Sequence, residues 1–253
     1  MVVVNHARQW GAAVLGSLLA RSLRATARTA TLRVASFEDE QGYGDSCAPL
    51  ADRLLREAAA GHVIVPFWSA QQLVIALLAA ERFGLGPALE RFDVVHDDSF
   101  GGEMVGHVGD AFGLHMRCIH TRASGQRLAD VSDWLRDPTS FFIAVDGGSP
   151  YGSVPTGIIR LAARLGSTLW PLAVQARPAL RCPGLVAALP LRSAWVGLAS
   201  EPPLRVERRT PVAAAADELK RRLDTATDAA RALSGAAQVG RGGRQSRPRQ
   251  RVA

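Results

Sequence analysis

The sequence is poor in the residues that build disulfide frameworks and zinc clusters. Its 253 residues hold only three cysteines, Cys47, Cys118 and Cys182, which are widely spaced and odd in number. Such usage is typical of a reducing compartment, because domains held by disulfides carry more cysteines at closer spacing. We therefore expect the three thiols to act as packing residues, and we expect no metal site.

Long hydrophobic runs are also missing. Residues 10–24 hold about a dozen apolar residues and end with Arg21 and Arg24, whereas a membrane span requires roughly 20. A secretory signal would place its positive charges before the apolar stretch, and here they follow it. The segment predicts an amphipathic helix that lies on a membrane or packs on the domain, with Trp10 as an interfacial anchor.

Signatures of nucleotide binding are absent from the sequence as well. No G-x-G-x-x-G joins a first strand to a helix, and no glycine-rich run ends in lysine and serine or threonine. The single lysine, Lys220, lies in the last predicted helix. We therefore consider a nucleotide-binding or sugar-transferring function only a weak hypothesis for this sequence.

Positive charge exceeds negative charge, and much of the excess lies at the end of the chain. The formal net charge is +7, and residues 240–253 carry five arginines and no acid. Such a segment buries too little surface to offset its ordering entropy, which predicts a disordered basic tail. The tail is either simply solvated or contacts anionic lipid head groups. Because no aromatic residues are interleaved with the arginines, we expect no specific nucleic-acid partner.

The sequence does contain many apolar residues, 47% in all, arranged in short runs that alternate with helical patterns. This alternation is typical of an α/β fold with a largely parallel sheet. The predicted strands are Thr31–Val34, His62–Trp68, Phe92–His96, Leu114–Ile119, Phe141–Val145, Thr168–Ala173 and Ala194–Leu198. The predicted helices after the first are Pro49–Ala59, Ala70–Ala80, Glu103–Phe112, Ser124–Leu135, Thr156–Leu165 and Pro211–Leu233.

Several predicted strands are continuously apolar, such as Phe141–Val145, as expected when helices cover both faces of a central sheet. We divide the chain into an amino-terminal helix (1–30), an α/β domain (31–235) and the basic tail (236–253). Residues 142–174 predict a βαβ unit with a glycine-rich loop after its first strand. Ligands of such sheets bind beyond the carboxyl ends of the strands, so the site is expected in the loops there.

Titratable side chains follow the strand that ends at His96. Asp97, Asp98 and Glu103 come next, as a helix begins. A histidine beside carboxylates can act as a base towards a hydroxyl. The alternative is a polar loop in which Asp98 or Ser99 caps the helix.

Two further strand ends carry groups that suit a phosphate. Arg117 lies in the strand that ends at Ile119, and a guanidinium can donate two parallel hydrogen bonds to a phosphate. An ordinary ion pair at the sheet edge is an equal alternative. Asp146-Gly147-Gly148 follows the next strand, where glycines let a backbone approach a ligand closely, although such turns are also common in loops.

The order of these motifs resembles the lysophospholipid acyltransferase superfamily, in particular its bacterial branch long catalogued as a domain of unknown function. The resemblance covers roughly residues 60–175. Its segments are Phe67-Trp68-Ser69, Gly101-Gly102-Glu103, Met116-Arg117-Cys118, the loop from Asp146 to Gly152, Gly157-Ile158-Ile159-Arg160-Leu161-Ala162 and Trp170-Pro171-Leu172.

The resemblance implies a glycerolipid acyltransferase-like fold in which a histidine paired with an acid deprotonates an acceptor hydroxyl that attacks an acyl thioester. Ser69 stands where the family has its histidine, and Gly101 stands where it has an aspartate. The expected catalytic residues are therefore His96, Asp98 and Glu103. The expected substrate-binding residues are Ser69, Arg117, Asp146, Gly147, Gly148 and Gly152.

The resemblance thus implies transfer of an acyl chain to a lysophospholipid or lipid A-like acceptor. The donor would be an acyl-carrier or coenzyme A thioester, which is a co-substrate, with no cofactor. The protein would lie peripherally on an anionic membrane surface, at the cytoplasmic face of a bacterial inner membrane. The alternative is a non-catalytic lipid- or partner-binding pseudoenzyme of the same fold, which the changes at Ser69 and Gly101 favour.

Overall fold

The computed structural model describes residues 2–36, 44–80, 83–120, 139–146, 152–181 and 187–235. The helix predicted at Ser124–Leu135, the glycines Gly147 and Gly148, and the basic tail lie outside these ranges. The strands are β1 (Thr31–Ser36), β2 (Val63–Phe67), β3 (Asp93–Asp97), β4 (His115–Ile119), β5 (Phe141–Ala144), β6 (Thr168–Leu169), β7 (Leu172–Arg181), β8 (Ala188–Ser200) and β9 (Leu204–Arg205). The helices are α1 (Val2–Ala27), α2 (Ala48–Ala60), η1 (Ser69–Gln71), α3 (Gln72–Leu78), α4 (Gly86–Leu89), α5 (Phe100–Ala111), α7 (Thr156–Leu165) and α8 (Val212–Gly235).

The predicted central sheet is present, with strand order β4-β3-β5-β2-β6-β9. All its pairings are parallel except that of β6 with β9, which confirms a mostly parallel sheet. Side chains alternate between its faces. Val65 and Val94 belong to a core cluster that includes α2, α3, α4 and α5, whereas Ile64 and Val95 pack with α7 and the first half of α8. Helices therefore cover both faces, as predicted.

The predicted βαβ unit is formed by β5, α7 and β6. The bounds of α7 match the predicted helix, and β2 lies between the two parallel strands, hydrogen-bonded to both. Ile158 and Ile159, in the first turn of α7, are buried against the central sheet. The helix ends at Gly166, whose φ of 65° is the left-handed conformation that glycine adopts at helix ends.

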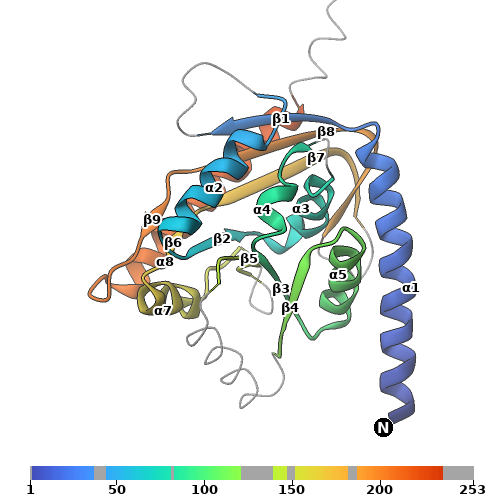
Figure 1. Ribbon diagram of the computed structural model, residues 1–253, viewed down its shortest axis with the longest axis horizontal. Helices are drawn as coiled ribbons and strands as arrows, with labels where there is room; N and C mark the ends of the chain where they lie inside the picture. The colour runs from blue at the N-terminus through green and yellow to red at the C-terminus, as the bar shows by residue number, and fades with distance from the viewer. Residues whose placement is uncertain are drawn as a thin grey trace, which may run out of the picture.

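A second sheet, of order β1-β8-β7, was not predicted, and this corrects the assignment of all strands to one sheet. The strand predicted at Thr168–Ala173 is in fact two, because β6 ends at Leu169 and β7 begins at Leu172. Pro171 lies between them and has no N–H to donate to a ladder. The chain leaves the central sheet there and enters the smaller one, where β7 pairs antiparallel with β8 (Figure 1).

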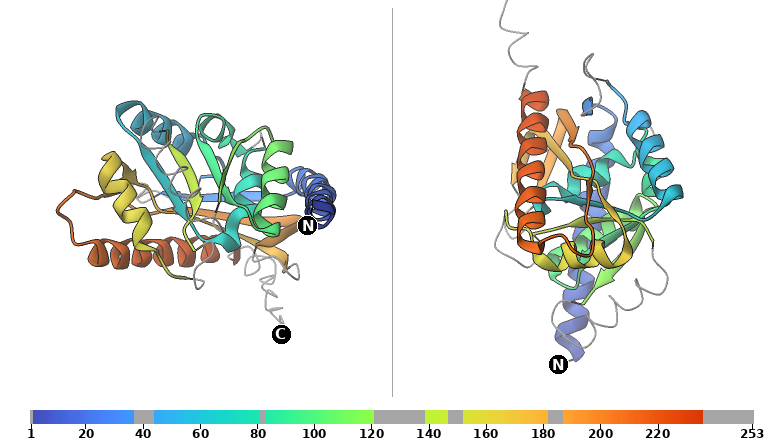
Figure 2. Two further views of the ribbon diagram at one scale, coloured as in Figure 1. Left: turned by 90° about the horizontal axis from the view of Figure 1, so that it is seen from below. Right: turned by 90° about the vertical axis from the view of Figure 1, so that its left-hand side faces the viewer.

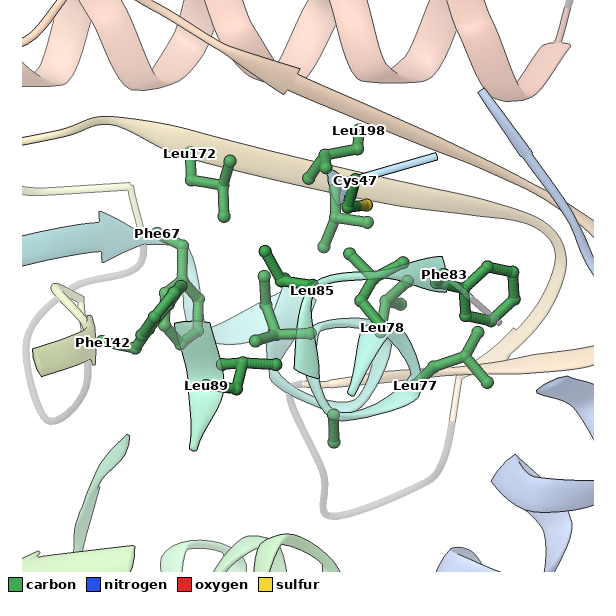
Figure 3. Packing of buried hydrophobic residues seen from close by; sticks show 14 of the residues in the cluster. Cys47, Phe67, Leu77, Leu78, Phe83, Leu85, Leu89, Phe142, Leu172 and Leu198 are labelled. Atoms are coloured by element: carbon green, nitrogen blue, oxygen red, sulfur yellow. The ribbon is translucent and has the colours of Figure 1, made fainter. Parts of the chain in front are cut away.

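The main core lies between the two sheets. Phe67 and Phe142 of the central sheet approach Leu172 and Leu198 of the smaller sheet, with leucines of α3 and α4 among them (Figure 3). Cys47 belongs to this cluster and is fully buried, and burial raises the pKa of its thiol to about 12. Its prediction as a packing residue is confirmed.

Helix α1 packs on the domain, one of the two alternatives predicted for it. It contacts α5 and β8, and Ala12, Ala20 and Leu23 are buried there. Figures 1 and 2 show it standing beside α5 at one side of the molecule. A Cβ on Gly16 would lie 2.6 Å from the Cβ of His107, so the crossing needs a glycine. In the described part of the chain, no helix is long and apolar enough to cross a bilayer.

Helix α8 covers the outer side of the smaller sheet, where it contacts β7 and β8 (Figure 2). Ala226 and Ala230 pack against Ala173 and Ala199 with little space between helix and sheet. A Cβ on Gly197 of β8 would lie 2.1 Å from the carbonyl oxygen of Ala230. Small residues on both partners thus let the helix lie close to the strand.

Candidate functional site

Three parallel strands bring most of the predicted site residues to one edge of the central sheet. The chain leaves β2 at Ser69, β3 at Asp98 and β5 at Asp146, and β5 is hydrogen-bonded to both β2 and β3. His96, at the end of β3, is therefore at the same edge as Asp146. The sequence placed both at this edge, and the strand register agrees.

Asp146 is the centre of a hydrogen-bonded polar cluster at this edge. Its carboxylate is 3% exposed and accepts 2.7 Å hydrogen bonds from the backbone N–H and the hydroxyl of Ser69. Its second oxygen accepts from the backbone N–H of Gly152, at 3.3 Å. Gly152 has a φ of 77°, which favours glycine. Because the N–H groups of Ser69 and Gly152 and the Ser69 hydroxyl donate to this carboxylate, they are not available to a bound phosphate.

His96 faces the other way, towards α5. Its Nδ1 lies 3.0 Å from the carbonyl oxygen of Asp97, which can only accept, so Nδ1 carries the proton in this contact. The lone pair of the neutral ring is then on Nε2. A Cβ on Gly106 would lie 3.0 Å from Nε2, so the ring packs on the backbone of α5.

The loop between His96 and α5 is held by its own hydrogen bonds. Ser99 caps the helix, because its hydroxyl accepts from the backbone N–H of Gly102 at 3.0 Å. That hydroxyl and the Ser99 N–H both donate to a carboxylate oxygen of Asp97, at 2.5 and 3.1 Å. A Cβ on Gly102 would collide with Asp97. The capping role considered for Ser99 is confirmed.

Glu103 pairs with a residue of α1 that the sequence did not single out. Arg8 Nη2 lies 3.3 Å from Glu103 Oε1 and donates to the backbone carbonyl of Asp98 at 2.7 Å. Arg8 thus ties the amino-terminal helix to the loop after β3. Arg8 Nε and Glu103 Oε2 are buried without a hydrogen-bond partner among the described residues. Asp98 takes part in this contact through its backbone carbonyl.

A groove of about 580 Å³ opens between α1 and α5, with His96 among its walls. From α1 it is lined by Gln9, Trp10 and Ala13, and from β3 and α5 by His96, Glu103, Gly106, His107 and Asp110. It contains His96 and Glu103, two of the predicted catalytic residues. Its size falls in the range of small-molecule sites.

Arg117 is directed away from this groove. Its Nε lies 2.8 Å from Asp93 Oδ2, at the amino end of β3, and Thr139 donates to the same oxygen at 3.0 Å. This is the ion pair that was considered as the alternative to phosphate binding. A role in binding a phosphate stays a prediction and would require Arg117 to leave Asp93.

The structure thus places the predicted residues in two groups at one edge. Ser69, Asp146 and Gly152 are joined by hydrogen bonds, and His96 and Glu103 line the groove. Among the described residues, no hydrogen bond links the two groups, and no cluster of histidine, cysteine or acidic side chains could hold a metal.

Sequence reasoning missed His107 and Asp110, which line the groove. The spacing of Glu103, His107 and Asp110, at i, i+4 and i+7, places all three on one helical face, and this signal was readable. Arg8 and Trp10 come from a helix outside the family resemblance, so their place beside His96 follows only from tertiary packing.

No family model matches this chain, and no curated protein matches it either. Among solved structures, the chain is similar to the 1-acyl-sn-glycerophosphate (LPA) acyltransferase PlsC from Thermotoga maritima. The two are 13% identical with a TM-score of 0.44, over 90% of this chain and 81% of that chain.

Proposed function

We propose that this protein transfers an acyl chain from a thioester to a hydroxyl of a lysophospholipid or lipid A-like acceptor, with His96 as general base. The supporting observation is the orientation of His96. Its Nδ1 faces a backbone carbonyl, which leaves the lone pair on Nε2, and His96 is one of the residues that line the groove. A histidine fixed in this tautomer can take a proton from a bound hydroxyl.

The proposed reaction has two proton transfers. His96 Nε2 removes the proton of the acceptor hydroxyl while that oxygen attacks the thioester carbonyl carbon. The carbon–sulfur bond then breaks, and the departing thiolate takes the proton back from the imidazolium. The products are an ester and a free thiol, and His96 returns to its neutral form. The described acids near His96 make no hydrogen bond to its ring, so the backbone carbonyl of Asp97 orients it instead.

The exposed side of α1 supports binding of the protein to a membrane surface. Four large apolar side chains on this helix are between 40% and 74% exposed, namely Trp10, Val14, Leu15 and Leu18. Arg21 and Arg24 follow on the same helix and are also exposed. Apolar residues with a tryptophan and nearby basic charge are typical of helices that lie in a bilayer interface. We propose peripheral binding at the cytoplasmic face of a bacterial inner membrane.

A non-catalytic lipid-binding protein is the second candidate. Ser69, where the family has its histidine, is 5% exposed and bound to Asp146, so it supplies no base. The hydrogen-bonded group of Ser69, Asp146 and Gly152 therefore stabilises the fold and supplies no catalytic base. In this alternative the groove binds a lipid, and no ester forms.

The test uses purified protein with labelled acyl coenzyme A or acyl-carrier thioester and a panel of lysophospholipids. Wild type should form labelled ester, and His96→Gln should lower the rate by about 100-fold or more, the usual contribution of a general base. His115→Gln, at an exposed position at the amino end of β4, is the matched control and should keep full activity.

Two results would decide against the enzyme. Equal transfer by His96→Gln and wild type, with both folded by circular dichroism, would exclude His96 as the base. Absence of transfer to every acceptor, while lysophospholipid still binds, would support the non-catalytic protein.

A further inference from the structure

The groove between α1 and α5 is lined by acids without a lysine or arginine among its lining residues. Glu103 and Asp110 are its two carboxylates, and Arg8 lies on Glu103 from outside the lining. Asp110 is exposed, and its carboxylate makes no hydrogen bond or ion pair with any described residue. Among the described residues, no basic side chain therefore forms an ion pair with the Asp110 carboxylate, and the groove has a negative potential.

The position of Asp110 at the carboxyl end of α5 increases this negative potential. The last turn of a helix carries partial negative charge, so an acid there is unfavourable unless a cation joins it. A cation does lie at this end of α5, but it binds the backbone and not the Asp110 carboxylate. Arg24 donates to the carbonyl of Ala111, and its guanidinium carbon lies 5.5 Å from the ring centre of Phe112.

An indole lies at the same groove. Trp10 is 74% exposed, far more than a packing residue, and lines the groove from α1 opposite the α5 acids. The face of a tryptophan ring attracts cations, and it does so most strongly for quaternary ammonium groups, which carry little hydration. An exposed indole and an unpaired carboxylate in one groove are the two elements that bind such groups.

We infer that this groove takes the positively charged end of a zwitterionic lysophospholipid, a quaternary or primary ammonium, between the Trp10 ring and the Asp110 carboxylate. This rests on the proposed function for its acceptor class and narrows that class. An acceptor with only a phosphate would meet two carboxylates in the groove. Arg8 is paired with Glu103 and Arg117 with Asp93, and Arg24 donates to the carbonyl of Ala111.

The first test measures binding alone, with choline as the probe and 3,3-dimethyl-1-butanol as its neutral isostere. The two differ by a nitrogen replaced with carbon, so only the charge is compared. In low salt, the Trp10 indole N–H resonance of the full chain, assigned with Trp10→Phe, should shift and saturate with choline. The neutral isostere should bind at least about fivefold more weakly, because cation–π and charge attraction are lost.

Two variants test the residues. Asp110→Asn should weaken choline binding at least about fivefold, whereas Asp52→Asn, an exposed acid on α2, should leave it unchanged. Trp10→Leu keeps an apolar side chain without a ring face and should lose binding as measured by calorimetry. Equal binding of choline and its isostere, or an unaltered affinity in Asp110→Asn, would overturn the inference.

A second experiment separates this inference from the proposed activity. Wild type should prefer lysophosphatidylcholine to lysophosphatidic acid as acceptor, and Asp110→Asn should reduce the preference. Transfer at equal rates to both acceptors, unchanged in the variant, would refute the ammonium site while the acyltransferase stands. Choline binding that depends on Asp110, without transfer to any acceptor, would support the ammonium site and refute the enzyme.

Discussion

The carboxylate of Asp146 holds Ser69 by two hydrogen bonds of 2.7 Å, one from the backbone N–H and one from the hydroxyl. The contact joins the end of β5 to the first turn after β2. Both residues are at least 95% buried, so the carboxylate depends on these donors for its solvation.

This relationship predicts a stability cost for substitutions on either side. Asp146→Asn should lower the free energy of unfolding by about 2 kcal/mol and Ser69→Ala by about 1 kcal/mol, because donors to a buried charge are lost or left unpaired. Denaturant unfolding measures both. The double variant should cost less than the sum, since the residues share one interaction. Additive effects would mean that the hydrogen bonds contribute little.

The crossing of α1 over α5 predicts opposite effects of alanine at two glycines. In Gly16→Ala the new Cβ would lie 2.6 Å from His107 and 3.0 Å from the Met104 carbonyl, so the helices must separate. A loss of about 1 to 3 kcal/mol is expected. In Gly11→Ala the nearest atom is 3.7 Å away, and alanine should add up to about 1 kcal/mol through helix propensity. Thermal unfolding of both variants checks the pair, and a stabilised Gly16→Ala would contradict the crossing.

An acid on α8 predicts a pH dependence of stability. Hydrogen bonds from Arg221 and Arg222 lower the pKa of Glu218 from about 4.5 to about 2. Because the pKa is lower in the folded state, this contribution is complete above pH 4.5 and is lost as the pH falls towards 2. Glu218→Gln should therefore cost at most about 1 kcal/mol at pH 7, for a largely solvent-exposed pair, and only a small part of that at pH 2. Chemical unfolding from pH 7 to 2 measures the difference, with Glu207→Gln as the control.

The buried thiol of Cys47 predicts slow alkylation. A pKa of about 12 leaves almost no thiolate at pH 8, and burial blocks access. Iodoacetamide followed by mass spectrometry should find Cys47 unmodified in the native protein and modified after denaturation. Cys118, which is only half-buried, is the internal comparison. Rapid native labelling of Cys47 would show that the core around it opens.

Local patterns predicted the central sheet well, because continuous apolar runs and helix periodicity are properties of neighbouring residues. The strand ends at His96 and Asp146 were predicted at one edge for the same reason. The smaller sheet was not predicted, since β1 pairs with β8 through residues distant in sequence, such as Thr31 with Trp195. The ion pair between Arg8 and Glu103 likewise depends on packing between helices that are distant in sequence.

The pairing of β1 with β8 has a consequence for synthesis of the chain. Thr26, at the end of α1, donates to the carbonyl of Pro190, 164 residues later, and Leu23 and Leu32 are buried beside these late residues. During translation β1 therefore lacks its parallel partner β8 until most of the protein has emerged, whereas α1 can pack on α5 earlier. The parallel strands β2 to β6 of the central sheet lie closer together in sequence and can assemble earlier, and the pairing of β1 with β8 forms late.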